Sequence, residues 1–370
     1  QRGEAEALLL KGKCLDYFGD YREALAVDFK ALTKSNLEKN SVLIARSLRQ
    51  VGGMYEATGR YDKALYYLTK SYDLSVKVNY LKGVASALSD MGVVYEARSN
   101  YNLALNCFYK SILIKLKIKD YRNLSHTLVC ISTVYQSIWN YESAFDILLH
   151  AVQINKRIGN NLGISSCYIH IAELLIELGH LEKALEYIKL GHSLRLTTGS
   201  KESIYKDYAE LGNIYWKLNR LDSSIFYLKK SVIFLTHIND ITNLKFSIDN
   251  LAEAYKSVNE FDSAIFYFNK GIEIDRIRQS LPDEIESLIE LGGIFLKKNE
   301  ISKSTKLFIQ AKNLALKIEN INYIRRNLLH LEYQLLEKKG QYKAALKSYK
   351  TFILLRDSIL NQDKKTAVAL

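Results

Sequence analysis

The sequence predicts an all-α protein, a solenoid of about nine helix–turn–helix repeats. Three observations predict it: small and aromatic residues recur every 40 positions, the apolar residues follow a helical period, and helix breakers are rare. Of the 370 residues, only Pro282 is a proline and 18 are glycines, and a proline interrupts the interior of a helix. We therefore expect long helices joined by short connections over nearly the whole chain.

Three series of positions define the 40-residue period. The first holds large, mostly aromatic residues: Tyr21, Tyr61, Tyr101, Tyr141, Leu181, Leu221, Phe261 and Ile301. Three positions later stand Ala24, Ala64, Ala104, Ala144, Ala184, Ser224, Ala264 and Ser304. Seven positions further on stand Ala31, Ser71, Ser111, Ala151, Gly191, Ser231, Gly271 and Ala311. A ninth copy, shifted by one residue, begins at Tyr342, and a fixed period of this length is the signature of a repeat architecture.

Each repeat contains two helical stripes. In the second repeat one stripe is Leu48, Val51, Gly52 and Tyr55, at spacings i, i+3, i+4 and i+7. After a turn at Gly59-Arg60, a second stripe begins with Ala64, Leu65 and Leu68. The small residues belong where the paired helices cross, because a larger side chain would push the helix axes apart.

These residues resemble the tetratricopeptide repeat, whose pattern reads Trp-x2-Leu-Gly-x2-Tyr followed by Ala-x3-Phe. The chain has Leu88-x2-Met91-Gly92-x2-Tyr95 with Ala104-x3-Phe108, Tyr208-x2-Leu211-Gly212-x2-Tyr215, and Ile248-x2-Leu251-Ala252-x2-Tyr255 with Ala264-x3-Phe268. HEAT and armadillo arrays have a similar period but lack this signature. The resemblance implies a right-handed superhelical solenoid over residues 1–353, with repeats starting near residues 5, 45, 85, 125, 165, 205, 245, 285 and 326.

The array departs from the standard repeat in its period and at its ends. The period is 40 rather than 34 and the closing proline is absent, so we expect the second helix of each repeat to be longer than usual. The first copy has Asp28 where its neighbours have Leu68 or Phe108, as suits a capping repeat. Residues 354–370 are expected to form a helical extension or linker.

Repeats of this length occur in kinesin light chain and in the sensor regions of Bacteroidetes-type histidine kinases and their LuxR-like relatives. The segment from Tyr349 to Asn361 resembles the link to a coiled coil and transmembrane helix in those sensors. The resemblance implies a non-catalytic module that binds a protein or peptide, as the sensory or scaffold region of a larger bacterial signalling protein. The alternative is a free-standing cytoplasmic adaptor. The compartment would be periplasmic for a sensor region and cytoplasmic otherwise.

No motif in the chain predicts an enzyme or a cofactor. H-E-x-x-H, G-x-S-x-G, Walker-type and Rossmann sequences are all absent, and the four cysteines lack the C-x-x-C spacing of a zinc site. A metal shared by His126 and His170 is a weaker alternative to a polar groove. Because the chain has no run of about 18 apolar residues, we expect membrane contact only through segments outside it.

The net charge of +12 raises nucleic acid as a partner, but the basic residues are dispersed. An RNA-binding array is therefore the least favoured reading, since no base-contacting residue recurs from repeat to repeat. We expect no nucleic-acid partner, and the sequence gives no reason to choose between a monomer and a homodimer.

In an array of this family the first helix of each repeat lines the concave side, which places a set of polar side chains there. They are Arg46, Arg49, Gln50, Asp90, His126, His170, Glu173, Glu177, Glu210, Asn213, Trp216, Asp249, Asn250 and Glu253. Acidic residues concentrate from Glu173 to Glu253, which favours a basic segment of the partner. Asn213 and Asn250 are suited to hold a peptide backbone, and Trp216 to anchor a side chain. The alternative is that these are ordinary solvated positions.

Overall fold

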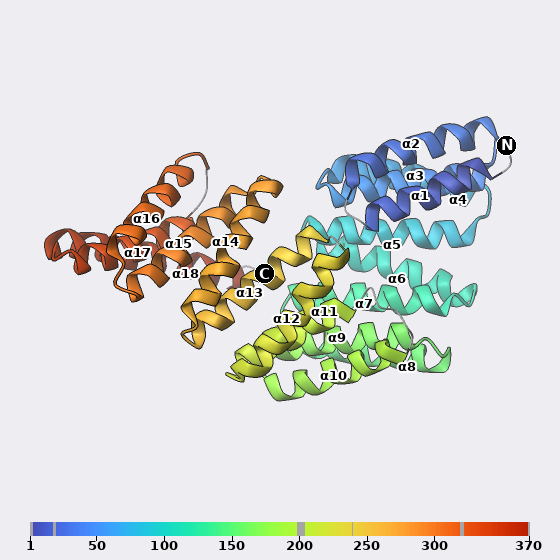
Figure 1. The fold of residues 1–370 in the computed structure, drawn as a ribbon. Coiled ribbons are helices and arrows are strands. Elements are labelled where there is room, and N and C mark those ends of the chain that lie inside the picture. Colours follow the sequence, from blue (N-terminus) through green and yellow to red (C-terminus); the bar gives the residue numbers. More distant parts are fainter. Residues whose placement is uncertain (1–2, 18–19, 198–203, 239, 319–321, 369–370) are drawn as a thin grey trace. The chain divides into compact units, whose positions relative to one another are not determined.

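The computed structural model describes residues 3–17, 20–197, 204–238, 240–318 and 322–368. Within these ranges it consists of 18 α-helices and contains no strand (Figure 1). Consecutive helices pack in pairs, as the two stripes of each repeat predict. The chain divides into an N-terminal unit, residues 1–200, and a C-terminal unit, residues 201–370.

The N-terminal unit comprises the first ten helices. They are α1 (Glu4–Tyr17), α2 (Tyr21–Leu37), α3 (Ser41–Ala57), α4 (Tyr61–Lys77), α5 (Leu81–Ala97), α6 (Tyr101–Lys117), α7 (Tyr121–Ser137), α8 (Tyr141–Arg157), α9 (Asn161–Glu177) and α10 (Leu181–Thr197). The C-terminal unit comprises α11 (Ile204–Lys217), α12 (Leu221–Ile238), α13 (Ile241–Ser257), α14 (Phe261–Arg278), α15 (Leu281–Lys297), α16 (Ile301–Ala315), α17 (Asn322–Lys338) and α18 (Tyr342–Val368). The periodic series that opens with Tyr21 marks the first residue of every second helix.

Short, regular connections produce the 40-residue period. From α2 to α10 each helix has 17 residues, and each helix from α3 to α10 starts 20 residues after the one before it. Both helices of a repeat are therefore equally long there, and the expected lengthening is not confined to the second. Gly59 shows how a helix ends: its φ is 71°, its N–H donates to Glu56 O at 2.8 Å, and the N–H of Arg60 donates to Tyr55 O at 2.8 Å. This pair of bonds is the Schellman motif.

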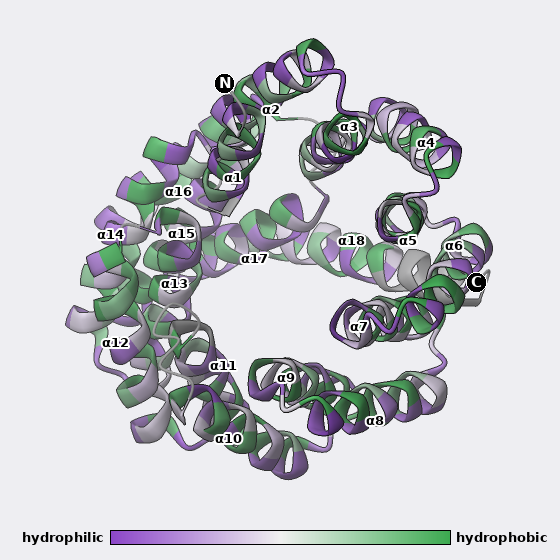
Figure 2. Ribbon diagram, turned by 90° about the vertical axis from the view of Figure 1, so that its right-hand side faces the viewer, coloured by the Kyte–Doolittle hydropathy of each residue, from purple (hydrophilic) through white to green (hydrophobic). Residues whose placement is uncertain are grey.

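Within each unit, first helices of neighbouring repeats contact one another in addition to the second helices that adjoin them in the chain. In the N-terminal unit α1, α3, α5, α7 and α9 contact one another in succession, and in the C-terminal unit α11 contacts α13 and α15 contacts α17. The first helices therefore form the concave side of each unit, as the sequence predicts. Figure 2 shows that the helices carry both hydrophilic and hydrophobic stretches, which is the pattern of helices that bury one face.

The small residues of the repeat lie at the helix crossings. All members of the series from Ala24 to Ser304 are fully buried. Where serine replaces alanine its hydroxyl donates to a carbonyl of the partner helix, from Ser224 to Gly212 O and from Ser304 to Gly292 O, both at 2.7 Å. The hydroxyl therefore has a hydrogen-bond partner, and the two helices need not move apart to accommodate it.

Two adjacent glycines of α3 test this packing. A Cβ on Gly52 would lie 2.7 Å from Leu68 Cγ, whereas a Cβ on Gly53 would meet nothing within 4 Å. We expect Gly52→Ala to destabilise the fold by about 1–3 kcal/mol through overpacking. Gly53→Ala should instead stabilise it by about 0.5–1 kcal/mol, because alanine loses less conformational entropy in a helix. Urea unfolding followed by circular dichroism measures both, and effects of equal sign would contradict this account.

The fifteenth residue of each second helix, here called the interface position, is buried. It is occupied by Ser35, Ser75, Lys115, Asn155, Arg195, Leu235, Asp275 and Ala315. Most of these side chains are polar and find different partners. Ser35 Oγ lies 3.1 Å from Ser47 Oγ, Lys115 Nζ donates to Ser89 Oγ at 2.8 Å, and Asn155 Nδ2 donates to Ser125 Oγ. The apolar core of the solenoid is thus interrupted by a different polar contact in most repeats.

Helix α18 continues past the last repeat. It runs without a break from Tyr342 to Val368, so residues 354–368 extend the final helix, and residues 369–370 lie outside the described part. No described helix is long and apolar enough to cross a membrane.

Candidate binding grooves on the concave sides

All the side chains that the sequence assigns to a groove lie on first helices. In the N-terminal unit α3 carries Arg46, Arg49 and Gln50, α5 carries Asp90, α7 carries His126, and α9 carries His170, Glu173 and Glu177. In the C-terminal unit α11 carries Glu210, Asn213 and Trp216, and α13 carries Asp249, Asn250 and Glu253. The predicted acidic strip is therefore divided between the two units, and each part is described separately.

Arg49 and Asp90 form an ion pair between neighbouring repeats of the N-terminal unit. Arg49 Nη1 lies 2.8 Å from Asp90 Oδ2, and both side chains are about 30% exposed. Gln50 lies beside them and uses its amide nitrogen twice, donating to Leu9 O at 2.9 Å and to Asp28 Oδ1 at 2.6 Å. The carbonyl oxygen of the Gln50 side chain can therefore accept a hydrogen bond from a ligand.

Two cavities meet at this ion pair. One of about 280 Å³ has Asp16, Glu56 and Asp90 in its wall, and one of about 370 Å³ has Arg46 and Lys82. Lys13 and Arg49 line both. Sequence reasoning missed Lys13 and Lys82, because the groove was read from the second repeat onward and Lys82 lies in the first turn of its helix.

The two histidines have separate partners. His126 Nδ1 lies 3.8 Å from Cys130 Sγ on the same helix. Desolvation and the nearby Lys115 ammonium lower the pKa of His126. His170 Nδ1 lies 2.9 Å from Glu173 Oε2, and Glu177 is exposed at the end of α9. Among the described residues, no group of three or more His, Cys, Asp and Glu side chains is placed to hold a metal.

The C-terminal unit has an acidic cavity of about 240 Å³ between α13, α15 and α17. Its wall includes five carboxylates and one lysine: Asp249, Glu253, Asp283, Glu286, Glu290 and Lys245. The sequence analysis named the first two of these. Glu286 and Glu290 were missed, although they stand 240 residues after Arg46 and Gln50 and the 40-residue register alone would have found them.

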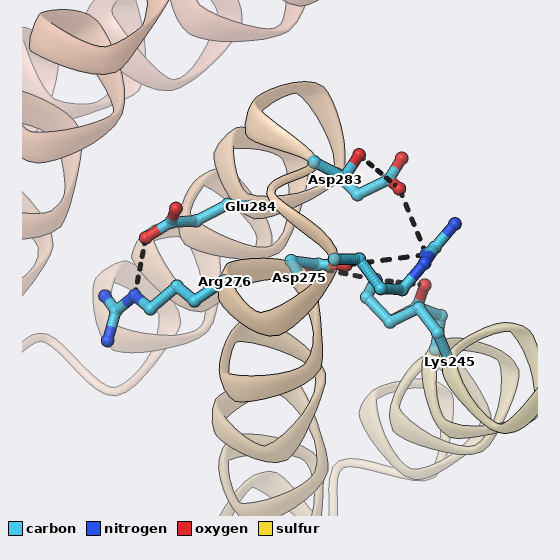
Figure 3. A network of polar contacts seen from close by, with 8 residues as sticks. Lys245, Asp275, Arg276, Asp283 and Glu284 are labelled. Carbon is cyan, nitrogen blue, oxygen red and sulfur yellow. Dashed lines mark hydrogen bonds and ion pairs between the residues drawn. The ribbon is translucent and has the colours of Figure 1, made fainter. Parts of the chain in front are cut away.

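Burial leaves these carboxylates poorly solvated. Desolvation raises the pKa of Asp249, Glu253 and Glu286, and the neighbouring Asp283 carboxylate raises that of Glu286 further. Lys245 Nζ lies 3.1 Å from Asp275 Oδ2 (Figure 3). It also lies 2.5 Å from Asp249 Oδ2. Asp249 Oδ1 and Asn250 Nδ2 are buried and have no hydrogen-bond partner. Polar atoms left without partners in this way are candidates for contact with a ligand.

A larger cavity of about 550 Å³ adjoins the acidic one, and the two share Ile289 and Glu290. Its apolar wall includes Leu296 and Leu331. Lys256 Nζ bridges Glu253 and Glu290 at 2.6 Å each. The two cavities together form the C-terminal groove: an acidic compartment followed by a wider, partly apolar one.

The three predicted residues of α11 line neither of these two cavities. Trp216 is 40% exposed and its Nε1 donates to Ser257 Oγ on α13 at 3.3 Å. Asn213 is half-buried.

Two family profiles, both described as tetratricopeptide repeat, match the chain, one over residues 43–117 and the other over 165–195, 208–232 and 247–277. No curated protein sequence matches it.

Many solved structures are similar in fold. One is a signal transduction ATPase with numerous domains (STAND) that has a tetratricopeptide repeat sensor, from Pyrococcus horikoshii, with a TM-score of 0.63 and 14% identity over 93% of this chain and 55% of that one. Another is a Rap protein complexed with competence and sporulation factor, with a TM-score of 0.57 and 15% identity over 98% and 100%. A third is the Rap conjugation gene regulator of plasmid pLS20 with the Phr* peptide, with a TM-score of 0.55 and 16% identity over 99% and 98%.

Repeat motif, helix pairing and comparisons agree. The chain contains tetratricopeptide repeats over the matched residues and is folded as an α-solenoid of consecutive helix pairs.

Proposed function

We propose that this chain is a non-catalytic module that binds a peptide, or an extended segment of a protein. It would recognise the basic side chains of that partner. The observation that carries the proposal is the C-terminal groove, in which an acidic compartment opens into a partly apolar one. Tetratricopeptide repeats support a protein-interaction module, and solenoids of this kind use their concave surfaces for binding.

The electrostatics of the groove favour a cationic occupant. Five carboxylates line the acidic compartment with Lys245, and Lys256 at its edge bridges Glu253 and Glu290. The carboxylates still outnumber these cations, and desolvation already penalises the charged forms of Asp249, Glu253 and Glu286. An arginine or lysine side chain of the partner would stabilise these carboxylates and so offset the hydration that they lose on burial. The unpartnered Asp249 Oδ1 offers it an acceptor, and the compartment beside Leu296 and Leu331 suits an apolar neighbour.

The similar structures support both the type of partner and the context. Two of them are Rap proteins, one in complex with competence and sporulation factor and one with the Phr* peptide, and a third is a STAND protein whose repeats are named as a sensor. We extend this to the present chain as the sensory or scaffold region of a larger signalling protein, with a free-standing adaptor as the alternative. A kinase or DNA-binding domain encoded in the same gene would favour the sensory role.

Removing two carboxylates from the groove tests the site. We expect Glu286→Gln combined with Glu290→Gln to weaken binding of a fluorescent peptide in which Lys or Arg precedes Leu by at least 10-fold, measured by fluorescence anisotropy. The matched control is Asp222→Asn combined with Glu273→Gln, two exposed positions of the same unit with the same charge change, for which the loss should stay below 2-fold. Equal losses in both variants would mean that net charge, rather than the groove, governs binding.

The pH dependence and the residues of α11 give two further arms of the same experiment. Protonation neutralises carboxylates whose pKa is raised, so the affinity of the native chain should fall as the pH is lowered from 8 to 5. Replacing Asn213 and Trp216 of α11 together with Asn250 of α13 by alanine tests whether these residues belong to the binding surface. A partner captured from the native host and retained by this triple variant would exclude these residues from the site.

A further inference from the structure

We infer that the N-terminal unit contains a second binding site with the opposite charge preference, for an oxyanion carried by a peptide side chain. The site is the cavity of about 370 Å³ between α1, α3 and α5. Four cationic side chains line it, Lys13, Arg46, Arg49 and Lys82, and no carboxylate is among its lining residues in the described part of the chain. The proposed function above rests on the other unit, so this inference is independent of it.

The two arginines are held in place by carboxylates outside the cavity. Arg49 Nη1 bonds Asp90 Oδ2 at 2.8 Å, and Arg46 Nη1 bonds Glu6 Oε1 at 3.1 Å. A guanidinium has five N–H donors in a planar fork, so each arginine keeps donors for a ligand after its ion pair is made. Fixed guanidinium groups suit carboxylate and phosphate, which they bind through two parallel hydrogen bonds.

The two lysines have no such partner. In the residues that the structure describes, neither Lys13 nor Lys82 has a carboxylate within ion-pair distance. Four cationic side chains therefore line the cavity, and only two of them are paired with carboxylates, those of Asp90 and Glu6. These six side chains together have a net charge of about +2. Desolvation lowers the pKa of Lys13, and Arg49 and Arg46 lower it further although Asp90 opposes them, the effect expected where like charges crowd without a sufficient counter-ion. A bound oxyanion would supply that counter-ion.

The adjoining cavity indicates a peptide rather than a free ion or a nucleic acid. It shares Lys13 and Arg49 with the first cavity, and its wall combines apolar Met54, Leu68 and Val93 with the carboxylates of Asp16, Glu56 and Asp90. A chain crossing both cavities would place an oxyanion among the cations and an apolar side chain beside it. The cations are confined to one compact cavity, whereas nucleic-acid surfaces carry a basic stripe along the phosphate backbone.

The variant Lys13→Gln with Lys82→Gln tests the site, because both side chains are exposed and their loss breaks no ion pair. The control is Lys30→Gln with Lys77→Gln, two exposed lysines of second helices in the same unit. The probes are three fluorescent peptides of one frame, with Leu beside a central Glu, phosphoserine or Gln, bound to the full chain and followed by anisotropy. We expect the Glu or phosphoserine peptide to bind at least 10-fold more tightly than the Gln peptide.

The preferred probe identifies the oxyanion as carboxylate or phosphate. K13Q/K82Q should weaken its binding at least 10-fold and K30Q/K77Q less than 2-fold, while the groove variant of Glu286 and Glu290 should leave it unchanged. Binding of all three peptides with equal affinity, or of none at 1 mM, would overturn the inference. A single-stranded RNA that binds more tightly than any peptide and is lost in K13Q/K82Q would overturn it in favour of nucleic acid.

Discussion

Replacing Lys245 with isoleucine is expected to destabilise the C-terminal unit by about 3–5 kcal/mol at pH 8, because the change leaves a buried carboxylate without its counter-ion. Asp275 is fully buried at an interface position, and Lys245, itself almost fully buried, is its nearest cation at 3.1 Å; Arg278 Nη1 is 3.9 Å away. Burial raises the pKa of Asp275 to about 6. The destabilisation should therefore shrink toward pH 5, where the carboxyl takes up a proton.

The next repeat supplies the matched control for this experiment. Forty residues on, the same two positions hold the apolar pair Ile285 and Ala315, both buried. We expect Asp275→Ala alone to cost less than Lys245→Ile, since Lys245 keeps its ion pair with Asp249. The double variant should recover most of the loss, because buried ion pairs are often replaced by apolar pairs at little cost.

Unfolding in urea, followed by the fluorescence of Trp216 in a Trp139→Phe background, reports on the C-terminal unit, because the two tryptophans lie in different units. Strictly additive losses in the double variant would show that Lys245 and Asp275 do not act as a pair.

Replacing Asp28 with leucine is expected to stabilise the N-terminal unit by up to about 4 kcal/mol at pH 8. Asp28 is fully buried where other repeats have Leu68 or Leu228, and its Oδ2 has no hydrogen-bond partner. Burial raises its pKa to about 7, against about 3.9 for an aspartate in an unfolded chain. The folded state therefore holds a proton that the unfolded state releases, and this carboxyl lowers stability as the pH rises from about 4 to 7.

Asp28→Asn separates the charge from the shape. Asparagine keeps an acceptor for Gln50 Nε2, so it should increase stability by about 1.5 kcal/mol at pH 5 and by more at pH 8. The exposed Asp73→Asn is the control and should stay within about 0.5 kcal/mol at both pH values. Thermal unfolding of the three proteins at both pH values measures the difference. If the stability of the native protein changed between pH 5 and 8 in parallel with that of Asp28→Asn, the raised pKa assigned to Asp28 would be wrong.

The periodic residues made the fold predictable from the sequence. Ala64 and Gly52 recur in register because only small residues fit at a helix crossing, and their burial follows from the period alone. The register also places Arg49 and Asp90 on the concave side, and it would have found Glu290 had it been carried through to the eighth repeat.

What the sequence does not reveal is which side chains meet. The pairing of Arg49 with Asp90 depends on the tilt between successive repeats, and the period contains no information about that tilt. Lys115 and Asp275 were also missed, because a charged residue in an apolar stripe ordinarily indicates the solvated edge of a helix. Their burial is intelligible only once Ser89 and Lys245 are seen opposite them.

The variety of side chains at the interface positions limits how such a gene can be rearranged. Because the repeat length is constant, recombination could delete or duplicate a 40-residue segment. Such an event would preserve the order and length of the helices. Loss of residues 121–160, however, would set Lys115 against Cys167 in place of Thr127, its present hydrogen-bond partner on α7. The junctions after Ser75, Leu235 and Ala315 carry no such polar match. We therefore expect relatives of this chain to differ in length mainly by insertions and losses at those three junctions.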